Sequence, residues 1–344
     1  MEPPGIKCFF GLLGDAAPPA APPGGRPNPL ARAAELGYQG LVSEKTPTRF
    51  GYAALVGLPN AGKSTLLNAI LGQKLQIVTP KPQTTRDRVL AVHNEGAAQV
   101  VFLDTPGHHA PHGALGRYML DAIEAALAEA NVVVWLVDAA DHARDARLGP
   151  GELAVAERLA ATGRPIVVAP NKVDLLRRKE ALLPLLERLA GLPGVAEAIP
   201  ISAARAEGLD RLLAATAARL PAGPWLYPEE MLSDRADRFF AAERIREVIT
   251  ELTRKEVPYK VAVQIDRYVE QRRRVSIHAS IHVERATQRA ILVGKGGAMI
   301  REIGARARES ISQMLDRPVD LRLHVDVSPG WTGDRRSLER LGYA

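Results

Sequence analysis

One short segment, Gly57–Ser64, constrains the fold of this chain more than any other feature. It reads G-L-P-N-A-G-K-S and matches G-x-x-x-x-G-K-[ST], a loop whose glycines let backbone N–H groups turn inward around phosphate. The apolar run Tyr52–Val56 precedes it and a helical pattern over Thr65–Leu71 follows. The segment is therefore predicted to join a strand to the N-terminus of a helix, which favours anions. Lys63 can reach the β- and γ-phosphates of a nucleotide, and the Ser64 hydroxyl can bind Mg²⁺.

From Phe50 onward, short apolar runs alternate with helical patterns. This alternation indicates βαβ units and a mostly parallel sheet. Only Asn94-Glu95-Gly96 separates the second and third predicted strands, so these two are expected to form an antiparallel hairpin at one edge. The predicted strands cover residues 52–56, 89–93, 100–103, 132–137, 166–169 and 198–201, and the later helices cover 115–130, 152–161, 178–190 and 209–220.

The sequence Pro221-Ala222-Gly223-Pro224 marks a break, after which the order of elements changes. An α-β-β-α-α-β order is predicted there, with a first helix over 237–255, strands over 260–268, 274–283 and 319–327, and two helices around 294–297. Residues 1–45 are rich in Pro, Ala and Gly, which predicts a disordered extension. We therefore expect an extension over 1–45, a first domain over 50–221, a linker over 222–236 and a second domain with a tail over 237–344.

The base of a bound nucleotide is predicted from Asn171-Lys172-Val173-Asp174, which follows a predicted strand. The Asp174 carboxylate can accept hydrogen bonds from N1–H and the 2-amino group of guanine, a donor pair that adenine lacks. A P-loop ATPase is therefore disfavoured. Asn171 can hold the loop, the stem of Lys172 can cover one face of the base, and the backbone of Ser202-Ala203 can meet the guanine oxygen.

Two further motifs complete a predicted magnesium site. Asp104-Thr105-Pro106-Gly107 ends the third predicted strand, so Asp104 can hold Mg²⁺ through water and the Gly107 N–H can meet the γ-phosphate. The segment before the second strand contains Thr84-Thr85-Arg86-Asp87, in which Thr85 is preferred over Thr84 as a residue that closes over Mg²⁺ when triphosphate is bound. The five motifs, in this order, resemble those of translation-factor-type GTPases.

The details resemble the Era family of GTPases over about residues 50–343. In the first domain the resemblance rests on Pro59-Asn60, on Gln83-Thr84-Thr85-Arg86 and on the 171–174 motif, which related ribosome and tRNA-modification GTPases share. The second domain is more discriminating, and its matching segments are Tyr227–Glu230, Asp234-Arg235, Phe239, Ala242–Glu247, Val257–Tyr259, Val283–Arg285, Gln288-Arg289, Ile291, Val293–Gly297, Ile300, Ile303-Gly304, Gly330-Trp331 and Leu341–Tyr343.

This resemblance implies a P-loop GTPase domain followed by a type II KH domain that binds single-stranded RNA. The residues themselves support a nucleic-acid surface, because nine basic and three acidic residues lie within 271–310, a net charge of +6 that equals the excess of the whole chain. The glycines of Gly294-Lys295-Gly296-Gly297 allow close approach of an RNA backbone. Arg285 and Arg301 are expected to add contacts, and the apolar side chains Ile291, Val293, Ile300 and Ile303 either line the adjacent groove or belong to the core.

The expected cofactors are GTP or GDP and Mg²⁺. Water would attack the γ-phosphate while Lys63, Thr85 and Mg²⁺ hold the site. His108 follows Gly107, where Era-like proteins usually carry an apolar residue and translation factors carry a water-positioning histidine, so it is a candidate catalytic residue. Asn60 resembles a residue that helps bind K⁺ in some GTPases, which makes K⁺ a candidate second cation.

The resemblance also implies binding near the 3′ end of small-subunit ribosomal RNA, action on the small-subunit precursor and peripheral attachment to the inner membrane. Cys8 is the only cysteine, and neither a secretory signal nor an apolar run of membrane-spanning length is evident. A cytoplasmic protein is therefore expected. A monomer is the expected oligomeric state. Two alternatives stay open: an RNA-binding assembly chaperone with a structural guanine nucleotide, and a tRNA-modification GTPase, which would need a further catalytic domain.

Overall fold

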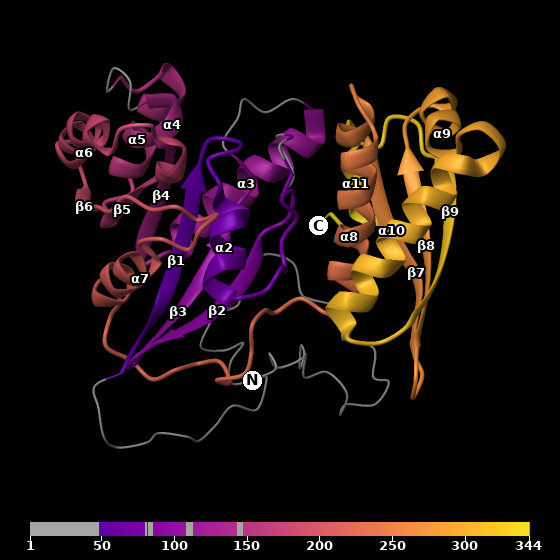
Figure 1. Cartoon of the computed structure of the whole chain (residues 1–344), viewed down its shortest axis with the longest axis horizontal. Coiled ribbons are helices and arrows are strands. Elements are labelled where there is room, and N and C mark those ends of the chain that lie inside the picture. The colour runs from indigo at the N-terminus through magenta and orange to yellow at the C-terminus, as the bar shows by residue number, and fades with distance from the viewer. Residues whose placement is uncertain (1–47, 80, 82–84, 108–112, 143–146, 344) are drawn as a thin grey trace.

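Two domains, each built on its own β-sheet, lie side by side in the computed structural model of the chain (Figure 1). The structure describes residues 48–79, 81, 85–107, 113–142 and 147–343. The extension predicted over 1–45 lies outside these residues, as does the candidate His108. Within the described residues, no helix is both long and apolar enough to cross a lipid bilayer.

The first domain contains a sheet in the order β2-β3-β1-β4-β5-β6. β2 pairs antiparallel with β3 at one edge and the other pairings are parallel, as the sequence predicted. The carboxyl ends of β1, β3 and β5 consequently meet at the same edge of the sheet. The strands are β1 (Arg49–Gly57), β2 (Val89–Glu95), β3 (Ala98–Asp104), β4 (Val132–Asp138), β5 (Ile166–Asn171) and β6 (Val195–Ala198).

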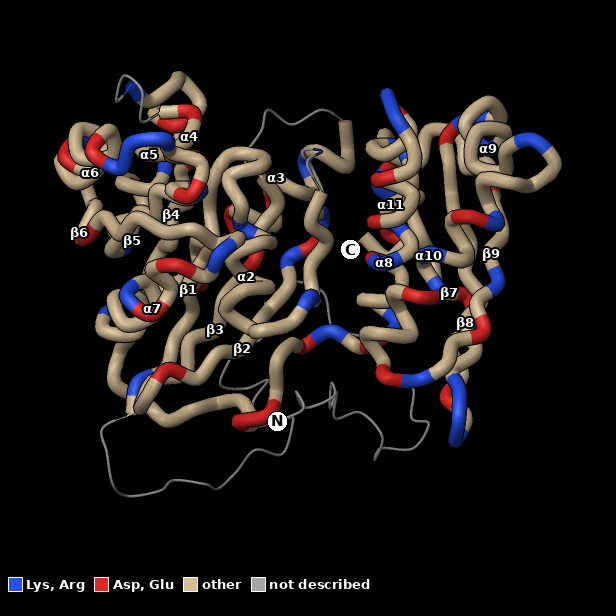
Figure 2. The backbone as a smooth tube through the Cα atoms, in the orientation of Figure 1, with Lys and Arg blue, Asp and Glu red and all other residues tan. Residues whose placement is uncertain are grey.

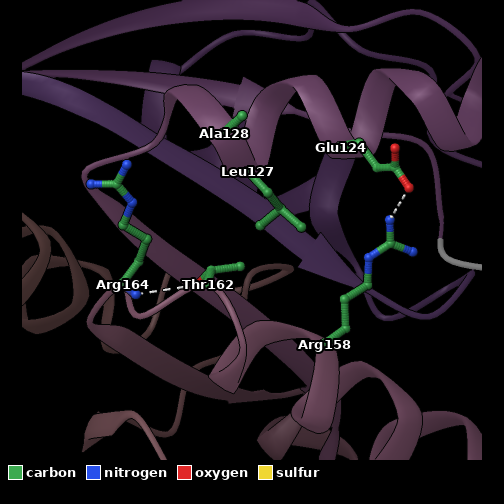
Figure 3. Close-up of a pocket in the computed structure, with 6 residues that line it drawn as sticks. All are labelled: Glu124, Leu127, Ala128, Arg158, Thr162 and Arg164. Carbon is green, nitrogen blue, oxygen red and sulfur yellow. Dashed lines mark hydrogen bonds and ion pairs between the residues drawn. The ribbon is translucent and has the colours of Figure 1, made fainter.

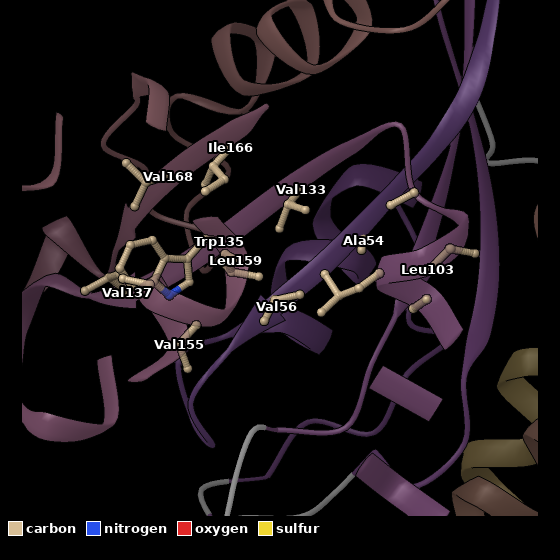
Figure 4. Packing of buried hydrophobic residues seen from close by; sticks show 14 of the residues in the cluster. Ala54, Val56, Leu103, Val133, Trp135, Val137, Val155, Leu159, Ile166 and Val168 are labelled. Atoms are coloured by element: carbon tan, nitrogen blue, oxygen red, sulfur yellow. The ribbon is translucent and has the colours of Figure 1, made fainter. Parts of the chain in front are cut away.

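Helices cover both faces of this sheet, because its central strands are apolar on both sides. One face packs against α2 (Lys63–Leu71) and α7 (Leu209–Ala218). The other packs against α3 (Gly113–Glu129), α5 (Pro150–Ala160) and α6 (Leu182–Ala190). Figure 4 shows the centre of this second layer, where Trp135 of β4 lies among valine and leucine side chains and is 1% exposed.

The second domain has the predicted α-β-β-α-α-β order around a sheet β7-β8-β9, in which β7 and β8 are antiparallel and β8 and β9 parallel. Its helices pack on one face of the sheet, the face turned towards the first domain in Figure 1. Ile303 is fully buried there, so it belongs to the core, whereas Ile291 is 47% exposed. The elements are α8 (Asp237–Leu252), β7 (Val261–Glu270), β8 (Val275–Val283), α9 (Ala286–Val293), α10 (Ala298–Leu315) and β9 (Val319–Val327), followed by α11 (Arg335–Arg340).

The last strand of the first domain differs from the prediction. β6 lies at Val195–Ala198 rather than at 198–201, because it is Val195, Glu197 and Ala198 that pair with β5, with a register shift between Ile166 and Val167. The residues predicted as this strand still lie alongside β5, since the Ile199 N–H donates to the carbonyl of Val168 at 2.9 Å. The helix predicted over 178–190 is divided into a 3₁₀ turn and α6, and the four-residue α4 (Ala139–His142) is too short to produce a periodic pattern.

Candidate functional site

The phosphate-binding loop leaves the carboxyl end of β1 and enters α2, as predicted. Lys63 is only 6% exposed, and its ammonium group donates to the carbonyl oxygens of Gly57 and Leu58 at 3.0 and 3.2 Å. Burial lowers the pKa of Lys63 to about 8, a shift that Asp104 partly opposes. A buried ammonium held by two carbonyl groups favours a nearby anion, as a nucleotide phosphate would supply.

Three oxygen-bearing side chains meet beside this loop. The Ser64 and Thr85 hydroxyl oxygens are 2.9 Å apart, and both lie near Asp104 Oδ2, at 3.5 and 3.4 Å respectively. Asp104 is fully buried, and its Oδ1 atom has no hydrogen-bond partner of normal geometry among the described residues. Burial raises the pKa of Asp104 to about 6 despite the opposing effect of Lys63. Two hydroxyls and a poorly solvated carboxylate suit Mg²⁺, which prefers hard oxygen ligands and keeps several waters.

The predicted guanine-binding residues also come together. Asn171 donates from Nδ2 to the Ala61 carbonyl at 2.8 Å and accepts at Oδ1 from the Ala203 N–H at 2.9 Å. Ser202 donates to Asp174 Oδ1 at 2.6 Å. Asn171 therefore joins the phosphate loop to the end of β5 and to the 202–203 turn. Asp174 follows β5 and bonds to the same turn, so it lies at the same edge of the sheet.

The other predicted nucleotide-site residues lie around this centre. Gly107 is next to the phosphate loop, because a Cβ atom added to it would lie 3.0 Å from Cα of Pro59. Asn60 has a φ of +65° and Lys172 a φ of +66°, while Thr65 lies in the first turn of α2. Lys172 forms an ion pair with Asp138 at 2.5 Å. The individual roles of these residues in binding stay predictions.

A separate hollow lies between α3 and α5, away from this centre (Figure 3). An ion pair between Arg158 and Glu124 at 2.7 Å crosses it. None of the residues predicted to bind nucleotide or RNA lines the hollow, so it is not part of the candidate site.

The glycine-rich loop of the second domain connects α9 to α10. Gly294, Gly296 and Gly297 have φ values of +71°, +57° and +77°, which residues other than glycine rarely adopt. A Cβ atom on Gly297 would lie 3.0 Å from Nη1 of Arg301, so the Arg301 guanidinium lies beside the loop. Lys295 and Arg301 are exposed, and Arg285 is exposed at the start of α9. Figure 2 shows Lys and Arg positions at this outer corner of the domain.

Sequence reasoning assigned no role to the contacts that join the two domains. Arg86 is 3% exposed and donates to backbone carbonyls of the second domain, and Glu247 of α8 binds Lys74. Arg244 and Glu247 are both buried in α8, but charged residues occur throughout this helix, so the sequence does not single these two out. Three of the four acceptors for Arg86 are backbone carbonyl groups, which leave no mark on the sequence.

Two family models match this chain. Residues 52–172 match the model for a 50S ribosome-binding GTPase, and residues 256–332 match the KH domain. Curated relatives cover most of the chain: GTPase Era of Nitratidesulfovibrio vulgaris strain DP4 is 42% identical over 301 residues, which is 87% of this chain and 98% of the relative. GTPase Era of Azotobacter vinelandii is 43% identical over 88% of this chain and 99% of the relative.

Two solved structures resemble the whole described chain. One is Era in complex with MgGDPNP and nucleotides 1506–1542 of 16S ribosomal RNA, with a TM-score of 0.82 and 37% identity over 86% of this chain and 99% of that one. The other is a single-substitution variant of Aquifex aeolicus Era bound to GDP·AlF₄⁻, with a TM-score of 0.81 and 38% identity over 86% of this chain and all of that one. Together with the phosphate loop, the predicted magnesium ligands and the KH fold, these similarities show that the chain belongs to the Era family of GTPases.

Proposed function

We propose that this protein is a GTP-hydrolysing switch that binds small-subunit ribosomal RNA near its 3′ end and assists maturation of the small ribosomal subunit. The observation that carries the proposal is the combination, in one chain, of a guanine-nucleotide site and a KH domain that contacts the Thr85-containing segment of that site. The solved relative with 16S ribosomal RNA supports the choice of RNA. The 50S description belongs to a family model that covers only residues 52–172, so it has less weight for the partner of the whole chain.

The two alternatives make different predictions. A tRNA-modification GTPase would require a further catalytic domain, whereas the Era relatives are matched over 98% and 99% of their own length by these two domains. A chaperone with a structural nucleotide would bind RNA without turnover. The arrangement of Ser64, Thr85 and Asp104 favours an enzyme, because a purely structural nucleotide does not need a complete magnesium site.

RNA binding is proposed to use Gly294–Gly297 with Arg301 and Arg285. A Lys295→Ala variant is expected to weaken binding of an RNA with the 3′-terminal small-subunit sequence and to lower the slope of log affinity against log salt by about 1, as for one lost phosphate contact. Fluorescence anisotropy over a salt series measures both values. Lys255→Ala, which removes an exposed lysine outside this loop, is the matched control. If both variants bind like the wild type, the loop is not the RNA contact.

Two further groups are proposed to assist hydrolysis. His108, which lies outside the described residues, would position the attacking water, so His108→Ala should lower kcat about 100-fold with KM nearly unchanged.

A K⁺ ion near Asn60 would supply transition-state charge, so replacing K⁺ by Na⁺ should lower kcat about tenfold or more. Steady-state phosphate release measures both effects. An unchanged kcat in either experiment removes the corresponding group from the mechanism.

The cytoplasmic location is proposed from the sequence, and the membrane attachment is proposed from the family resemblance alone. We propose that the protein is cytoplasmic and associates peripherally with the inner membrane. Fractionation of cells at low and high salt tests this, because a peripheral electrostatic attachment releases the protein at high salt. Recovery of the protein in the soluble fraction at both salt concentrations would contradict the membrane attachment.

A further inference from the structure

The segment that carries Thr85 is attached to the second domain at both ends. We call residues Lys74–Asp87 the switch segment; the structure describes all of it except 80 and 82–84. Near its start, the Lys74 ammonium pairs with Glu247 at 2.9 Å, and the Val78 N–H donates to the same carboxylate at 3.1 Å. Further along, the Lys81 ammonium donates to the carbonyl oxygen of Thr250 in the last turn of α8 and, at 2.5 Å, to that of Thr253, which directly follows the helix. A cation at that position complements the helix dipole as well as the unpaired carbonyls.

Arg86 forms the second attachment. Its guanidinium donates to the carbonyl oxygens of Val261 at 2.6 Å, Pro258 at 3.1 Å and Tyr259 at 3.2 Å, and to the Tyr343 hydroxyl at 3.2 Å. It also lies 5.9 Å from the centre of the Trp331 ring, within reach of a cation–π interaction. All these partners belong to the second domain or its C-terminal tail, and the planar fork of arginine satisfies several acceptors that lysine could not reach together.

Arg86 directly follows Thr85, the residue at the magnesium position. Consecutive Cα atoms are about 3.8 Å apart, so a fixed Arg86 leaves Thr85 little freedom. In the same structure the Thr85 hydroxyl is 2.9 Å from that of Ser64. The next residue, Asp87, accepts a hydrogen bond at 2.5 Å from Tyr118 of α3, the helix that follows the Gly107 loop. The close approach of Thr85 to Ser64 and the contacts of Arg86 with the second domain therefore occur in the same structure.

We propose that Arg86 is a positioning residue, which places the Thr85 hydroxyl at the magnesium position by anchoring the switch segment to the KH domain. This inference rests on the proposed function and names its regulation. Whatever holds Thr85 in place stabilises the Arg86 contacts, and those contacts in turn favour the nucleotide state that uses Thr85. Such coupling is reciprocal. The Arg86 contacts therefore change the ratio of the affinities for GTP and GDP by the same factor by which exchange of the nucleotide changes the equilibrium between contact and separation of the switch segment and the KH domain.

Two full-length variants, Arg86→Lys and Arg86→Gln, test the proposal. Arg88→Gln is the matched control, because Arg88 lies two residues further on and pairs with Glu129 inside the first domain at 2.5 Å. Affinities for GDP and for a non-hydrolysable GTP analogue are measured with Mg²⁺, followed by kcat and KM. We expect both Arg86 variants to bind the analogue about tenfold more weakly, within the usual range of coupling between sites, and to bind GDP within about twofold of the wild type.

The RNA arm uses an RNA with the 3′-terminal small-subunit sequence. With GDP bound, each Arg86 variant is expected to bind this RNA as tightly as the wild type does with GDP bound. The ratio of the RNA affinities with the analogue and with GDP is expected to move towards one in the variants. Equal losses for GDP and the analogue would make Arg86 a structural residue only, and unchanged affinities would remove its role; either result overturns the proposal. Failure of wild-type RNA binding would instead contradict the proposed function, and the nucleotide arm would still decide the role of Arg86.

Discussion

An Asp174→Asn variant is expected to bind GTP about 100- to 1000-fold more weakly than the wild type. It would lose the two charge-assisted hydrogen bonds to guanine that we propose for Asp174, each of about 1.5–3 kcal/mol, and other contacts of the nucleotide would offset part of that loss. The amide should instead accept xanthosine triphosphate, in which a carbonyl replaces the 2-amino group of guanine. Ser202, which donates to Asp174 Oδ1 at 2.6 Å, keeps the side chain at this position oriented and can do the same for an asparagine.

Competition between GTP and xanthosine triphosphate for the variant measures this change of preference. Asp210→Asn is the matched control, because Asp210 is an exposed carboxylate in the first turn of α7. The control should keep the guanine preference of the wild type. A variant at position 174 that also kept it would show that another group reads the base.

A Gly62→Ala variant is expected to lose at least about 100-fold in affinity for both GTP and GDP, since the substitution costs about 1–2 kcal/mol of backbone strain in addition to a steric clash. Gly62 has a φ of +98°, and a Cβ atom there would lie 2.2 Å from Nδ2 of Asn171. The clash would break the hydrogen bond from Asn171 to the Ala61 carbonyl, which joins the phosphate loop to the predicted guanine-binding motif.

Gly72→Ala separates the clash from the strain. Gly72 also has a left-handed backbone, with a φ of +65°, but a Cβ atom there would meet nothing within 4 Å. This control should lower the free energy of unfolding by about 1 kcal/mol and leave nucleotide affinity nearly unchanged. Isothermal titration with GDP and thermal unfolding of both variants measure the two effects. Equal nucleotide affinities for the two variants would contradict the proposed contact with Asn171.

The sequence predicts most of the fold because its signals are local. Strands such as β4 are continuous apolar runs between turns, and β9 lies at 319–327 as predicted. The errors occur where local pattern competes with pairing: β6 pairs with β5 through Val195–Ala198, although the more apolar run lies at 198–201. The short helix α11 was also missed, since a six-residue helix gives no periodic pattern, and it depends on Leu338 packing with residues of α3.

The clustering of the predicted nucleotide-binding residues follows from the sequence, because their motifs place particular residue types at fixed distances from strand ends. Asn171 and Asp104 consequently occupy positions that the order of strands alone implies. The contacts of Arg86 were not predictable, because its partners lie 172 to 257 residues away along the chain and three of them are backbone carbonyls. The KH domain gives an intermediate case. The glycines of its loop were identified, but the sequence left open whether Ile303 of α10 lines the RNA groove or belongs to the core, and the structure places it in the core.

The central claim is that the nucleotide bound to the first domain governs how tightly the second domain holds RNA. The direct test is the affinity of the wild-type protein for an RNA with the 3′-terminal small-subunit sequence, measured with a non-hydrolysable GTP analogue, with GDP and without nucleotide, at constant Mg²⁺ and salt. We predict about tenfold tighter binding with the analogue than with GDP. Equal affinities under all three conditions would contradict the coupling.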